Sequence, residues 1–417
     1  MNNHTIKTDF NDLGIAPRLL EILTRNKFSI PTPIQRQSIP FAIEGKDIMG
    51  IAQTGTGKTL AFGIPMLQRI AQSQGKHMGL VVLPTRELAL QVNETLKKLG
   101  TPIGIRTALL IGGEDIRKQQ RALQQQPHII IATPGRLIDH LEQGRLRLDR
   151  IQILVLDEAD RMLDMGFAPQ LKKILQRVPE QRQTMLFSAT MPDEIVKIAH
   201  AYMSLPLRVE VAPSGTAIEL VSQELFFVHR EEKISLLKTI LDQYNGSILV
   251  FSRTKHGAKK ITNGIRAFGY SAAEIHSNRT LKQRLEALEG FKIGRYKILV
   301  ATDIAARGID VKGIQLVINY DLPDNAEDYV HRIGRTGRAG MSGHAISFAT
   351  PEQRRDIHNI ERLIRKPLPV SKTPPLKRGE KPPQQTLAPQ KPFAQQQHPM
   401  HQQRNHFRPR RKPYKQF

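Results

Sequence analysis

The most distinctive candidate for chemistry is a glycine-rich stretch that reads Ala52-Gln53-Thr54-Gly55-Thr56-Gly57-Lys58-Thr59. It follows the apolar run Ile48–Ile51 and precedes a helical pattern. Glycines let backbone N–H groups turn toward phosphates, Lys58 would reach the outer phosphates, and the Thr59 hydroxyl would ligate Mg²⁺. The strict phosphate-loop pattern begins with glycine, whereas Ala52 stands there, and an ordinary glycine-rich turn is the alternative. The flanking strand and helix favour a nucleotide phosphate site.

A second candidate site is the acidic stretch Asp157-Glu158-Ala159-Asp160, which follows the apolar run Ile153–Leu156. A carboxylate at the end of a buried strand can hold the Mg²⁺ that bridges nucleotide phosphates, and Asp157 has that place. The adjacent Glu158 can position or deprotonate an attacking water. Alone, the stretch could equally be an acidic helix N-cap. Beside a phosphate loop, it predicts the metal and water side of a hydrolytic site.

The third candidate is the basic stretch His331-Arg332-Ile333-Gly334-Arg335-Thr336-Gly337-Arg338, whose arginines recur every third residue. On a helical turn that spacing places like charges on one side, where they repel each other unless an anion faces them. Arginine fingers stabilise a phosphoryl group in transfer and contribute roughly 10³–10⁵ in rate. A surface basic patch or an RNA phosphate contact is the alternative. Arg335 and Arg338 are therefore candidate catalytic residues, far along the chain from the phosphate loop.

Short apolar runs recur along the chain, and each ends in a polar or glycine-containing cluster. They are continuously apolar rather than alternating, as expected for strands buried on both faces of a sheet. Helical-looking stretches separate them, which predicts parallel α/β sheets that bind ligands beyond the carboxyl ends of their strands. The runs are Leu80–Leu83, Ile129–Ala132, Ile153–Leu156, Ile248–Phe251, Ile298–Ala301 and Leu316–Ile318.

The strand pattern restarts after a small, polar segment around Val211–Thr216, which is typical of a linker between two domains. Residues 366–417 differ again, with 11 of the 27 prolines, 12 Lys and Arg and one Glu, a net charge of +11. Such a segment cannot bury enough apolar surface to offset its ordering entropy. The expected parts are an N-terminal region, a nucleotide-binding domain, a linker, a second domain and a disordered basic tail. Their expected bounds are 1–38, 39–211, 212–217, 218–365 and 366–417.

The charge balance of the 417-residue chain favours a polyanionic partner, because 62 Lys and Arg against 38 Asp and Glu leave +24. Nucleic acid and an acidic membrane surface both fit that excess. The chain has no cysteine, which excludes disulfides and thiolate chemistry. Neither a signal peptide nor an apolar run of the roughly 18 residues that a membrane span needs is present. We therefore expect a cytoplasmic, nucleic-acid-binding protein with no membrane partner.

Together these motifs resemble those of the DEAD-box ATP-dependent RNA helicases, and most closely the bacterial RhlE-type subgroup. The resemblance covers roughly residues 10–365, and Asp157–Asp160 spell the family's signature. It implies two tandem RecA-like α/β domains that bind ATP, Mg²⁺ and RNA across their cleft. Phe28 with Pro31-Thr32-Pro33-Ile34-Gln35 resembles the family's adenine-reading Q motif, with Phe10 as the upstream aromatic residue. A carboxamide such as that of Gln35 can pair with both a donor and an acceptor on adenine.

The resemblance also implies roles for residues in both domains. The implied catalytic residues are Lys58, Asp157, Glu158, Arg335 and Arg338, with Thr59 and Asp157 on the metal. The implied ATP-binding residues are Phe10, Phe28, Gln35, Ala52, Gln53, Thr54, Gly55, Thr56, Gly57, Lys58, Thr59, Gly308, Asp310, Arg335 and Arg338. The implied RNA contacts are Pro84, Thr85, Arg86, Gly112, Gly113, Thr133, Pro134, Gly135, Arg136, Arg284 and Thr302. The residues implied to couple ATP hydrolysis to strand separation are Ser188, Ala189, Thr190, Asp303 and His331.

The second domain departs from the family pattern in one motif. The family usually carries Gln-x-x-Arg after a His-Gly pair, whereas this chain reads His276-Ser277-Asn278-Arg279-Thr280-Leu281-Lys282-Gln283-Arg284. Arg284 is in place, but Leu281 occupies the glutamine position and Ser277 the glycine position. Since leucine cannot make the hydrogen bonds of glutamine, we expect one polar contact to RNA to be missing. On that interpretation, Leu281→Gln would tighten RNA binding modestly.

The expected function is an ATP-dependent RNA helicase that couples RNA-stimulated ATP hydrolysis to local unwinding of RNA duplexes or remodelling of RNA–protein complexes. Contacts should go to RNA phosphates and 2′-hydroxyls, since the sequence shows no aromatic platform for base readout, so sequence specificity should be low. Both duplex and single-stranded RNA are expected partners, and ribosomal precursors or RNA-decay complexes are candidate assemblies. Two other classes remain open, a non-hydrolysing RNA chaperone and a DNA translocase, although a translocase would lack the Phe28–Gln35 element.

Overall fold

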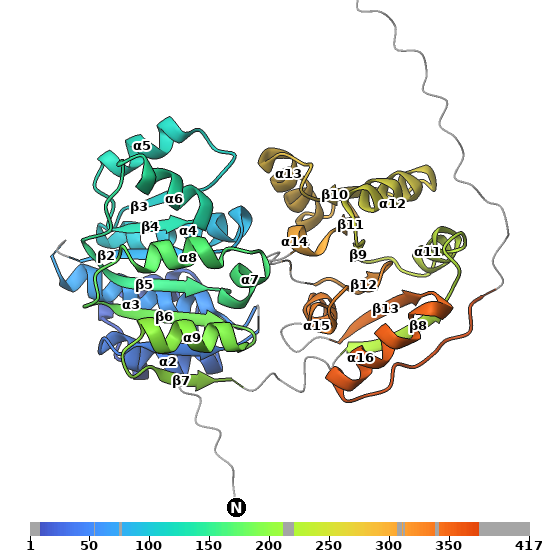
Figure 1. The fold of residues 1–417 in the computed structure, drawn as a ribbon, viewed down its shortest axis with the longest axis horizontal. Helices are drawn as coiled ribbons and strands as arrows, with labels where there is room; N and C mark the ends of the chain where they lie inside the picture. The colour runs from blue at the N-terminus through green and yellow to red at the C-terminus, as the bar shows by residue number, and fades with distance from the viewer. Residues whose placement is uncertain are drawn as a thin grey trace, which may run out of the picture.

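The computed structural model describes residues 9–53, 55–74, 77–211, 221–306, 311, 313–337 and 342–374. These residues form two α/β domains side by side, with the N-terminal domain at the left of Figure 1. Several sequence predictions fall outside the described residues. They are the site residues Thr54, Gly308, Asp310 and Arg338, the expected linker at 212–217, and residues 375–417 of the expected tail.

The first domain is built on a seven-stranded sheet with the order β3-β4-β2-β5-β6-β1-β7. Each pair of neighbouring strands runs parallel. Most of these strands are buried on both faces, which explains their continuous apolar sequences. The strands are β1 (Ile48–Ile51), β2 (Met78–Val82), β3 (Thr107–Leu110), β4 (Ile129–Ala132), β5 (Ile151–Asp157), β6 (Gln183–Ser188) and β7 (Leu207–Glu210).

Helices cover both faces of this sheet, with α8 and α9 in front in Figure 1. The α-helices are α1 (Pro17–Arg25), α2 (Pro33–Ile43), α3 (Lys58–Gln72), α4 (Arg86–Gly100), α5 (Ile116–Gln124), α6 (Pro134–Glu142), α7 (Ala159–Asp164), α8 (Ala168–Leu175) and α9 (Asp193–Tyr202). Two short 3₁₀ turns, η1 (Phe10–Leu13) and η2 (Thr101–Ile103), complete the domain.

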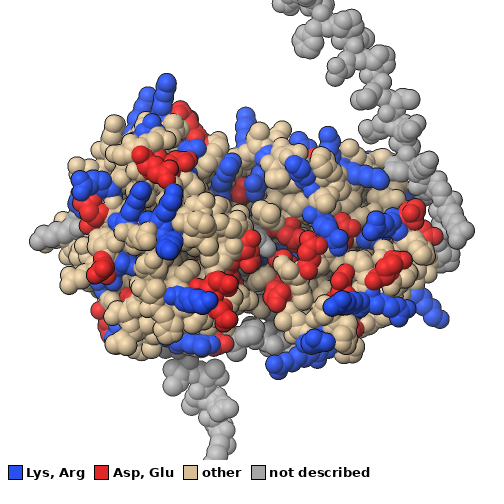
Figure 2. Space-filling model, viewed as in Figure 1, with Lys and Arg blue, Asp and Glu red and all other residues tan. Residues whose placement is uncertain are grey.

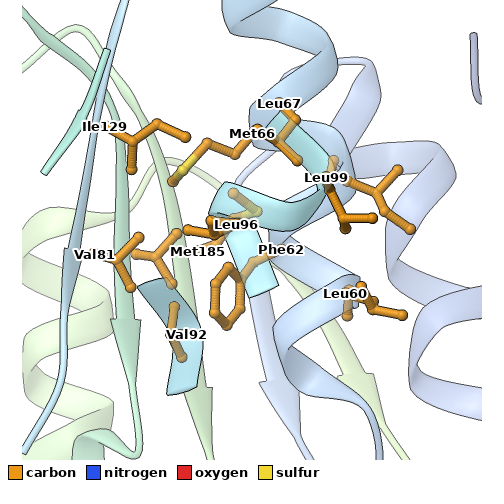
Figure 3. Packing of buried hydrophobic residues seen from close by; sticks show 14 of the residues in the cluster. Leu60, Phe62, Met66, Leu67, Val81, Val92, Leu96, Leu99, Ile129 and Met185 are labelled. Carbon is orange, nitrogen blue, oxygen red and sulfur yellow. The ribbon is translucent and has the colours of Figure 1, made fainter. Parts of the chain in front are cut away.

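The core on one face of the sheet fixes how α3 and α4 lie. Val92, Leu96 and Leu99 recur at helical spacing on α4, and they meet Phe62 and Met66 of α3 over the sheet (Figure 3). All five side chains are at most 1% exposed. Because α3 begins at the phosphate loop and α4 begins just after β2, this packing fixes both helix starts at the carboxyl edge of the sheet.

The second domain repeats the architecture with a six-stranded parallel sheet in the order β10-β11-β9-β12-β13-β8. Its strands are β8 (Val221–Phe227), β9 (Ile248–Phe251), β10 (Ala272–Ile275), β11 (Ile298–Ala301), β12 (Leu316–Asn319) and β13 (Gly343–Ala349). Its helices are α11 (Lys233–Leu241), α12 (Lys255–Ala267), α13 (Leu281–Lys292), α14 (Asp303–Ala306), α15 (Ala326–Ile333), η3 (Pro351–Gln353) and α16 (Arg354–Ile364). The prediction of two parallel α/β domains is confirmed, and each predicted apolar run coincides with most or all of a strand.

Residues 366–374 differ from the expectation that the tail begins at Lys366. The backbone of Leu225 in β8 donates to Pro369 O at 2.8 Å and accepts from Ser371 N at 2.9 Å. Leu368 is buried in the core of the second domain. This segment therefore covers the open edge of β8, a contact that composition alone did not reveal because one leucine and two backbone hydrogen bonds carry it. The expected N-terminal boundary at residue 38 likewise falls inside α2.

Candidate active site

The phosphate loop lies at the carboxyl end of β1, beside β6. Ala52 N donates to Ser188 O at 2.9 Å, which holds the start of the loop against the neighbouring strand. Gly55 and Gly57 have φ values of 88° and 91°, a left-handed conformation that glycine adopts without strain. Gly57 is also the N-cap of α3, so Lys58 and Thr59 form the first turn of that helix. A helix N-terminus of this kind favours bound phosphate.

Gln35 links the Q-motif region directly to this loop. Its Nε2 donates to Gly57 O at 2.9 Å, and its Oε1 accepts from Thr32 N at 2.9 Å, closing a capping box on α2. A Cβ built on Gly57 would sit 2.3 Å from Gln35 Nε2, so this close approach requires glycine. Phe10 is buried and Phe28 packs against the core of the same domain. The residues predicted to lie on the adenine side thus belong to the same domain as the loop.

The acidic stretch begins at Asp157, the last residue of β5, and lies beside the phosphate loop. Asp157 Oδ1 lies 4.0 Å from Lys58 Nζ, and both side chains are buried. Burial raises the pKa of Asp157 to about 6. Glu158 has a left-handed backbone with φ of 53°, unusual for a residue other than glycine, and its Oε2 lies 3.0 Å from Arg161 Nη1. Burial alone would raise the pKa of Glu158, but Arg161, Lys58 and Arg335 together hold it below its usual value.

Buried cationic atoms beside these carboxylates fit an incoming triphosphate. Among the described residues, neither Lys58 Nζ nor Arg161 Nη2 has a hydrogen-bond partner, although both atoms are buried. Charged donors left without acceptors in a protein interior are costly, and phosphate oxygens would satisfy them. Mg²⁺ in nucleotide sites is commonly held by one or two protein oxygens plus phosphates and water. Asp157 and the Thr59 hydroxyl at the start of α3 are ligands of that type.

The second domain brings His331 and Arg335 to this site. A small pocket between the domains is lined by Arg161 from the first and by Asp303, His331 and Arg335 from the second. Burial and the charges of Arg161 and Arg335 lower the pKa of His331, Asp160 and Asp328 oppose them, and the net pKa is about 4. Arg335 is 3% exposed, and its charge acts on Glu158 across the domain boundary. Predicted residues that lie about 175 positions apart in the chain are thus neighbours.

Arg332 does not have the place that the regular spacing of arginines suggested. It is 2% exposed and forms two hydrogen bonds with Asp303, Nε to Oδ1 at 2.5 Å and Nη2 to Oδ2 at 2.6 Å. Its Nη1 donates to Asn319 Oδ1 at 3.1 Å. Because α15 ends at Ile333, Arg335 lies beyond the helix, where its Nε donates to His331 O at 3.2 Å. The interpretation of the arginines as one row facing an anion is therefore wrong for Arg332.

The residues predicted to contact RNA gather at the carboxyl ends of strands in both sheets. Thr85 caps α4, and Thr133 and Pro134 begin α6. The Arg86 guanidinium lies against the Gly112–Gly113 turn, where a Cβ on Gly113 would meet Arg86 Nη1 at 2.5 Å. Across the boundary, Arg284 Nη2 lies 2.9 Å from Glu87 Oε2, a residue that the sequence did not single out. The remaining predicted contacts are Pro84 after β2, Gly135 and Arg136 in α6, and Thr302 after β11.

Comparison with known proteins identifies the family that this arrangement represents. Residues 32–198 match the DEAD/DEAH box helicase family, and residues 232–340 match the helicase conserved C-terminal domain. The chain is 44% identical over 370 residues to the DEAD-box ATP-dependent RNA helicase CshA of Geobacillus kaustophilus, covering 88% of this chain and 79% of that protein. The ATP-dependent rRNA helicase RRP3 of Scheffersomyces stipitis is 45% identical over 368 residues, covering 88% and 76%. The chain belongs to the DEAD-box ATP-dependent RNA helicases.

Solved structures of DEAD-box proteins show how the two domains are placed. S. cerevisiae Dbp5 bound to RNA and ADP BeF3 matches with a TM-score of 0.79 at 30% identity, covering 87% of this chain and 95% of that one. Mss116p bound to ssRNA and AMP-PNP matches with a TM-score of 0.81 at 27% identity, covering 90% and 81%. Each of these matches covers both RecA-like domains of this chain at once. The domain arrangement of this DEAD-box helicase is similar to that of the RNA-bound and nucleotide-bound relatives.

The family settles the two alternatives that the sequence left open. DEAD-box helicases bind ATP, and the named relatives are ATP-dependent RNA helicases, so neither a non-hydrolysing chaperone nor a DNA translocase describes this chain. In the described part of the DEAD-box protein, no helix is both long and apolar enough to cross a membrane. Figure 2 shows Lys and Arg spread over both domains on the face in view, rather than gathered in one patch.

Sequence reasoning did not select Arg161 or Glu87 individually, although both are buried charged residues at the candidate site of the DEAD-box protein. Arg161 directly follows the signature Asp157–Asp160, and Glu87 directly follows the implied RNA contacts Pro84, Thr85 and Arg86, so their positions were visible in the sequence. Their burial was the missing signal. Arg161 is 2% exposed and Glu87 is 3% exposed, and a charged residue this deeply buried almost always has a partner.

Proposed function

We propose that this DEAD-box helicase hydrolyses ATP·Mg²⁺ at the boundary between its domains and does so efficiently only when bound RNA holds the domains together. The observation that carries this proposal is the small pocket lined by Arg161 of the first domain and by His331 and Arg335 of the second, from which Arg335 lowers the pKa of Glu158. If the domains separated, Arg335 would leave the site while Lys58 and Glu158 stayed. RNA contacts on both domains then determine how often the complete site forms.

Each polar group near the site has a proposed task. Lys58 and the loop of Ala52–Thr59 hold the phosphates, and Thr59 and Asp157 hold Mg²⁺, which would offset phosphate charge when bound. Glu158, kept ionised by its neighbours, accepts a proton from the attacking water or orients it. Arg335, with Arg338, stabilises the charge that develops during phosphoryl transfer. Gln35 with Phe10 and Phe28 selects adenine, and Gly308 and Asp310 contact the ribose.

The RNA partners in the proposal follow from the type of residue at the strand ends. Backbone amides, threonine hydroxyls and Arg86, Arg136 and Arg284 are suited to phosphates and 2′-hydroxyls, which favours duplex and single-stranded RNA of any sequence. Ribosomal precursors are a proposed target because one named relative is an rRNA helicase, and RNA-decay complexes remain an alternative. The RhlE-type subgroup and a cytoplasmic location, both expected from the sequence, are part of the same proposal.

The experiment is ATP turnover with and without RNA for the native chain and two variants. Glu158→Gln should retain ATP and RNA binding while turnover falls about 10²–10⁴-fold, the usual contribution of general base catalysis. Glu94→Gln, at an exposed carboxylate on α4, is the matched control and should behave as the native protein does. Equal turnover of the native protein with and without RNA would overturn the proposed role of domain closure.

A further inference from the structure

The first turn of α13 reaches out of the second domain and packs on the first. Leu281 is 5% exposed and belongs to the hydrophobic core cluster of the first domain, and Leu285 packs against the same cluster. A Cβ built on Gly113 would lie 3.9 Å from Leu281 Cβ, so the leucine sits beside the Gly112–Gly113 turn. The sequence suggested an absent RNA contact at this position. The structure shows an apolar contact between domains instead.

The local fold of α13 aims three side chains in that direction. Leu281, Arg284 and Leu285 are related by three and four residues, which places them on one side of a helix. Thr280 caps the helix, and its hydroxyl accepts from Gln283 N at 3.3 Å. The capping box fixes the orientation of the first turn, because it satisfies backbone N–H groups that the helix leaves unpaired. The three side chains therefore reach the first domain as one rigid surface.

An ion pair lies within this apolar contact. Arg284 Nη2 and Glu87 Oε2 are 2.9 Å apart, with side chains 14% and 4% exposed. Burial lowers the pKa of Arg284, and Glu87 opposes that shift. Glu87 also lies in the first turn of α4, where the helix dipole favours a negative charge. Leu281 excludes water beside the pair, and charge pairs attract more strongly where water is excluded.

We propose that Leu281 is a positioning residue that stabilises the closed domain arrangement without requiring RNA. Apolar contact is non-directional and needs no hydrogen-bond partner, whereas a buried glutamine amide would need partners at this boundary. If part of the closed arrangement is stabilised by Leu281, less RNA is needed to populate it, because apparent affinity scales with the fraction of molecules in the competent state. The inference rests on the proposed closure of the domains over ATP and RNA.

The test measures domain closure and ATP turnover in parallel. The chain has no cysteine, so cysteines introduced at the exposed Gln143 and His358 would carry one fluorescent dye in each domain. Fluorescence energy transfer between the two dyes then reports domain closure. Leu281→Ala should lower the closed fraction with AMP-PNP alone, lower RNA-free turnover and raise the half-saturating RNA concentration about tenfold, equivalent to about 1.4 kcal/mol. Turnover at saturating RNA should stay near the native value. Leu281→Gln should change in the same direction, and Leu281→Met should remain close to native because it preserves the apolar volume.

Leu288→Ala is the matched control on the same helix. Leu288 is 4% exposed but belongs to the core of the second domain, so its loss should lower the melting temperature without changing the half-saturating RNA concentration. A native protein that fails to close with AMP-PNP and RNA contradicts the proposed function itself. Two outcomes contradict only the role of Leu281, provided that the native protein closes normally. One is a Leu281→Ala variant with native closed fraction and RNA requirement, and the other is tighter RNA binding by Leu281→Gln. An equal rise in RNA requirement for Leu288→Ala would assign the effect to general destabilisation and also overturn it.

Discussion

Asp160 and Thr190 are joined by two hydrogen bonds to one oxygen atom. Asp160 Oδ2 accepts from Thr190 N and from Thr190 Oγ1, each at 2.9 Å, and it also accepts from Ala189 N at 3.1 Å. Burial by itself would raise the pKa of Asp160, but Lys58 and these hydrogen bonds hold it below its usual value. The carboxylate that ends the DEAD motif after β5 is therefore bound to the loop after β6. Ala189 and Thr190 of that loop, with Ser188 at the end of β6, are three of the residues expected to couple hydrolysis to strand separation.

Removing the Thr190 hydroxyl tests this connection with little change in shape. Thr190→Val loses one side-chain hydrogen bond to Asp160, worth about 1 kcal/mol, while the backbone bond remains. We expect unwinding of a short RNA duplex to slow by roughly fivefold, with RNA-stimulated ATP turnover much less affected. Thr184→Val, on the preceding strand β6, is the control, because the Thr184 hydroxyl is buried with no hydrogen-bond partner among the described residues. Equal losses in unwinding and ATP turnover would argue against a coupling role.

Gln35 should influence nucleotide choice and also the shape of the phosphate loop. Gln35→Ala removes the bonds to Gly57 O and Thr32 N, so it loosens the loop and the cap of α2, at a cost of about 0.5–2 kcal/mol of stability. We expect weaker ATP use and poorer discrimination against GTP, measured as kcat/KM for both nucleotides. The exposed Gln37, two residues further along α2, provides the control Gln37→Ala. Comparable use of ATP and GTP by the native protein would show that Gln35 does not select adenine.

His331 should make domain closure sensitive to acid. Its pKa in the closed arrangement is about 4, against about 6.5 for an ordinary histidine. The neutral form is therefore favoured on closing, so stabilisation is complete above about pH 6.5 and is lost as pH falls toward 4. At pH 5 the loss should be on the order of 2 kcal/mol if opening restores an ordinary pKa.

The His331 prediction is best measured as a difference between two proteins. The closed fraction of the native chain and of His331→Gln is followed from pH 7.5 to about pH 5 by the same energy-transfer pair. Asp157, whose pKa is raised to about 6, titrates in the same pH range, but it is present in both proteins. The native chain should lose closure on acidification more steeply than the variant. Parallel curves would mean that His331 remains solvated in the closed state.

The basic tail should raise RNA affinity without altering the active site. A chain ending at Pro374 loses 10 Lys and Arg and one Glu but keeps the contacts of residues 366–374 with β8. Turnover at saturating RNA should be unchanged, while the RNA concentration needed rises roughly tenfold at low salt, because a tether raises local concentration. The difference should fade as salt increases, since counterion release drives such contacts.

A second truncation separates tethering from folding. A chain ending at Arg365 also loses Leu368 and the backbone pairing on β8, so its melting temperature should fall. The chain ending at Pro374 should melt as the full chain does. An unchanged RNA requirement and salt dependence in the chain ending at Pro374 would exclude the tether.

Local patterns in the amino-acid sequence were sufficient for the phosphate loop, the acidic motif and the fold class. Ile48–Ile51 and Ile248–Phe251 were recognisable as strands because both faces of a parallel sheet are buried, which leaves no polar alternation in the sequence. The positions of Gly55 and Gly57 were recognisable because a loop with positive φ favours glycine. In each case the physical requirement acts on residues close together in the chain, so it can be recognised in a short stretch of sequence.

Contacts between distant parts of the chain could not be recognised in this way. Leu281 was expected to be a missing RNA contact, but it is buried against residues of the first domain that lie about 170 positions away in the chain. Arg332 was placed in a row of arginines, yet its bonds to Asp303 and Asn319 arise only when β11, β12 and α15 come together. Residues 366–374 have the composition of a tail, but β8 offers them an unpaired edge. Burial and pairing are properties of the folded surroundings, and the same leucine or arginine has a different role wherever those surroundings differ.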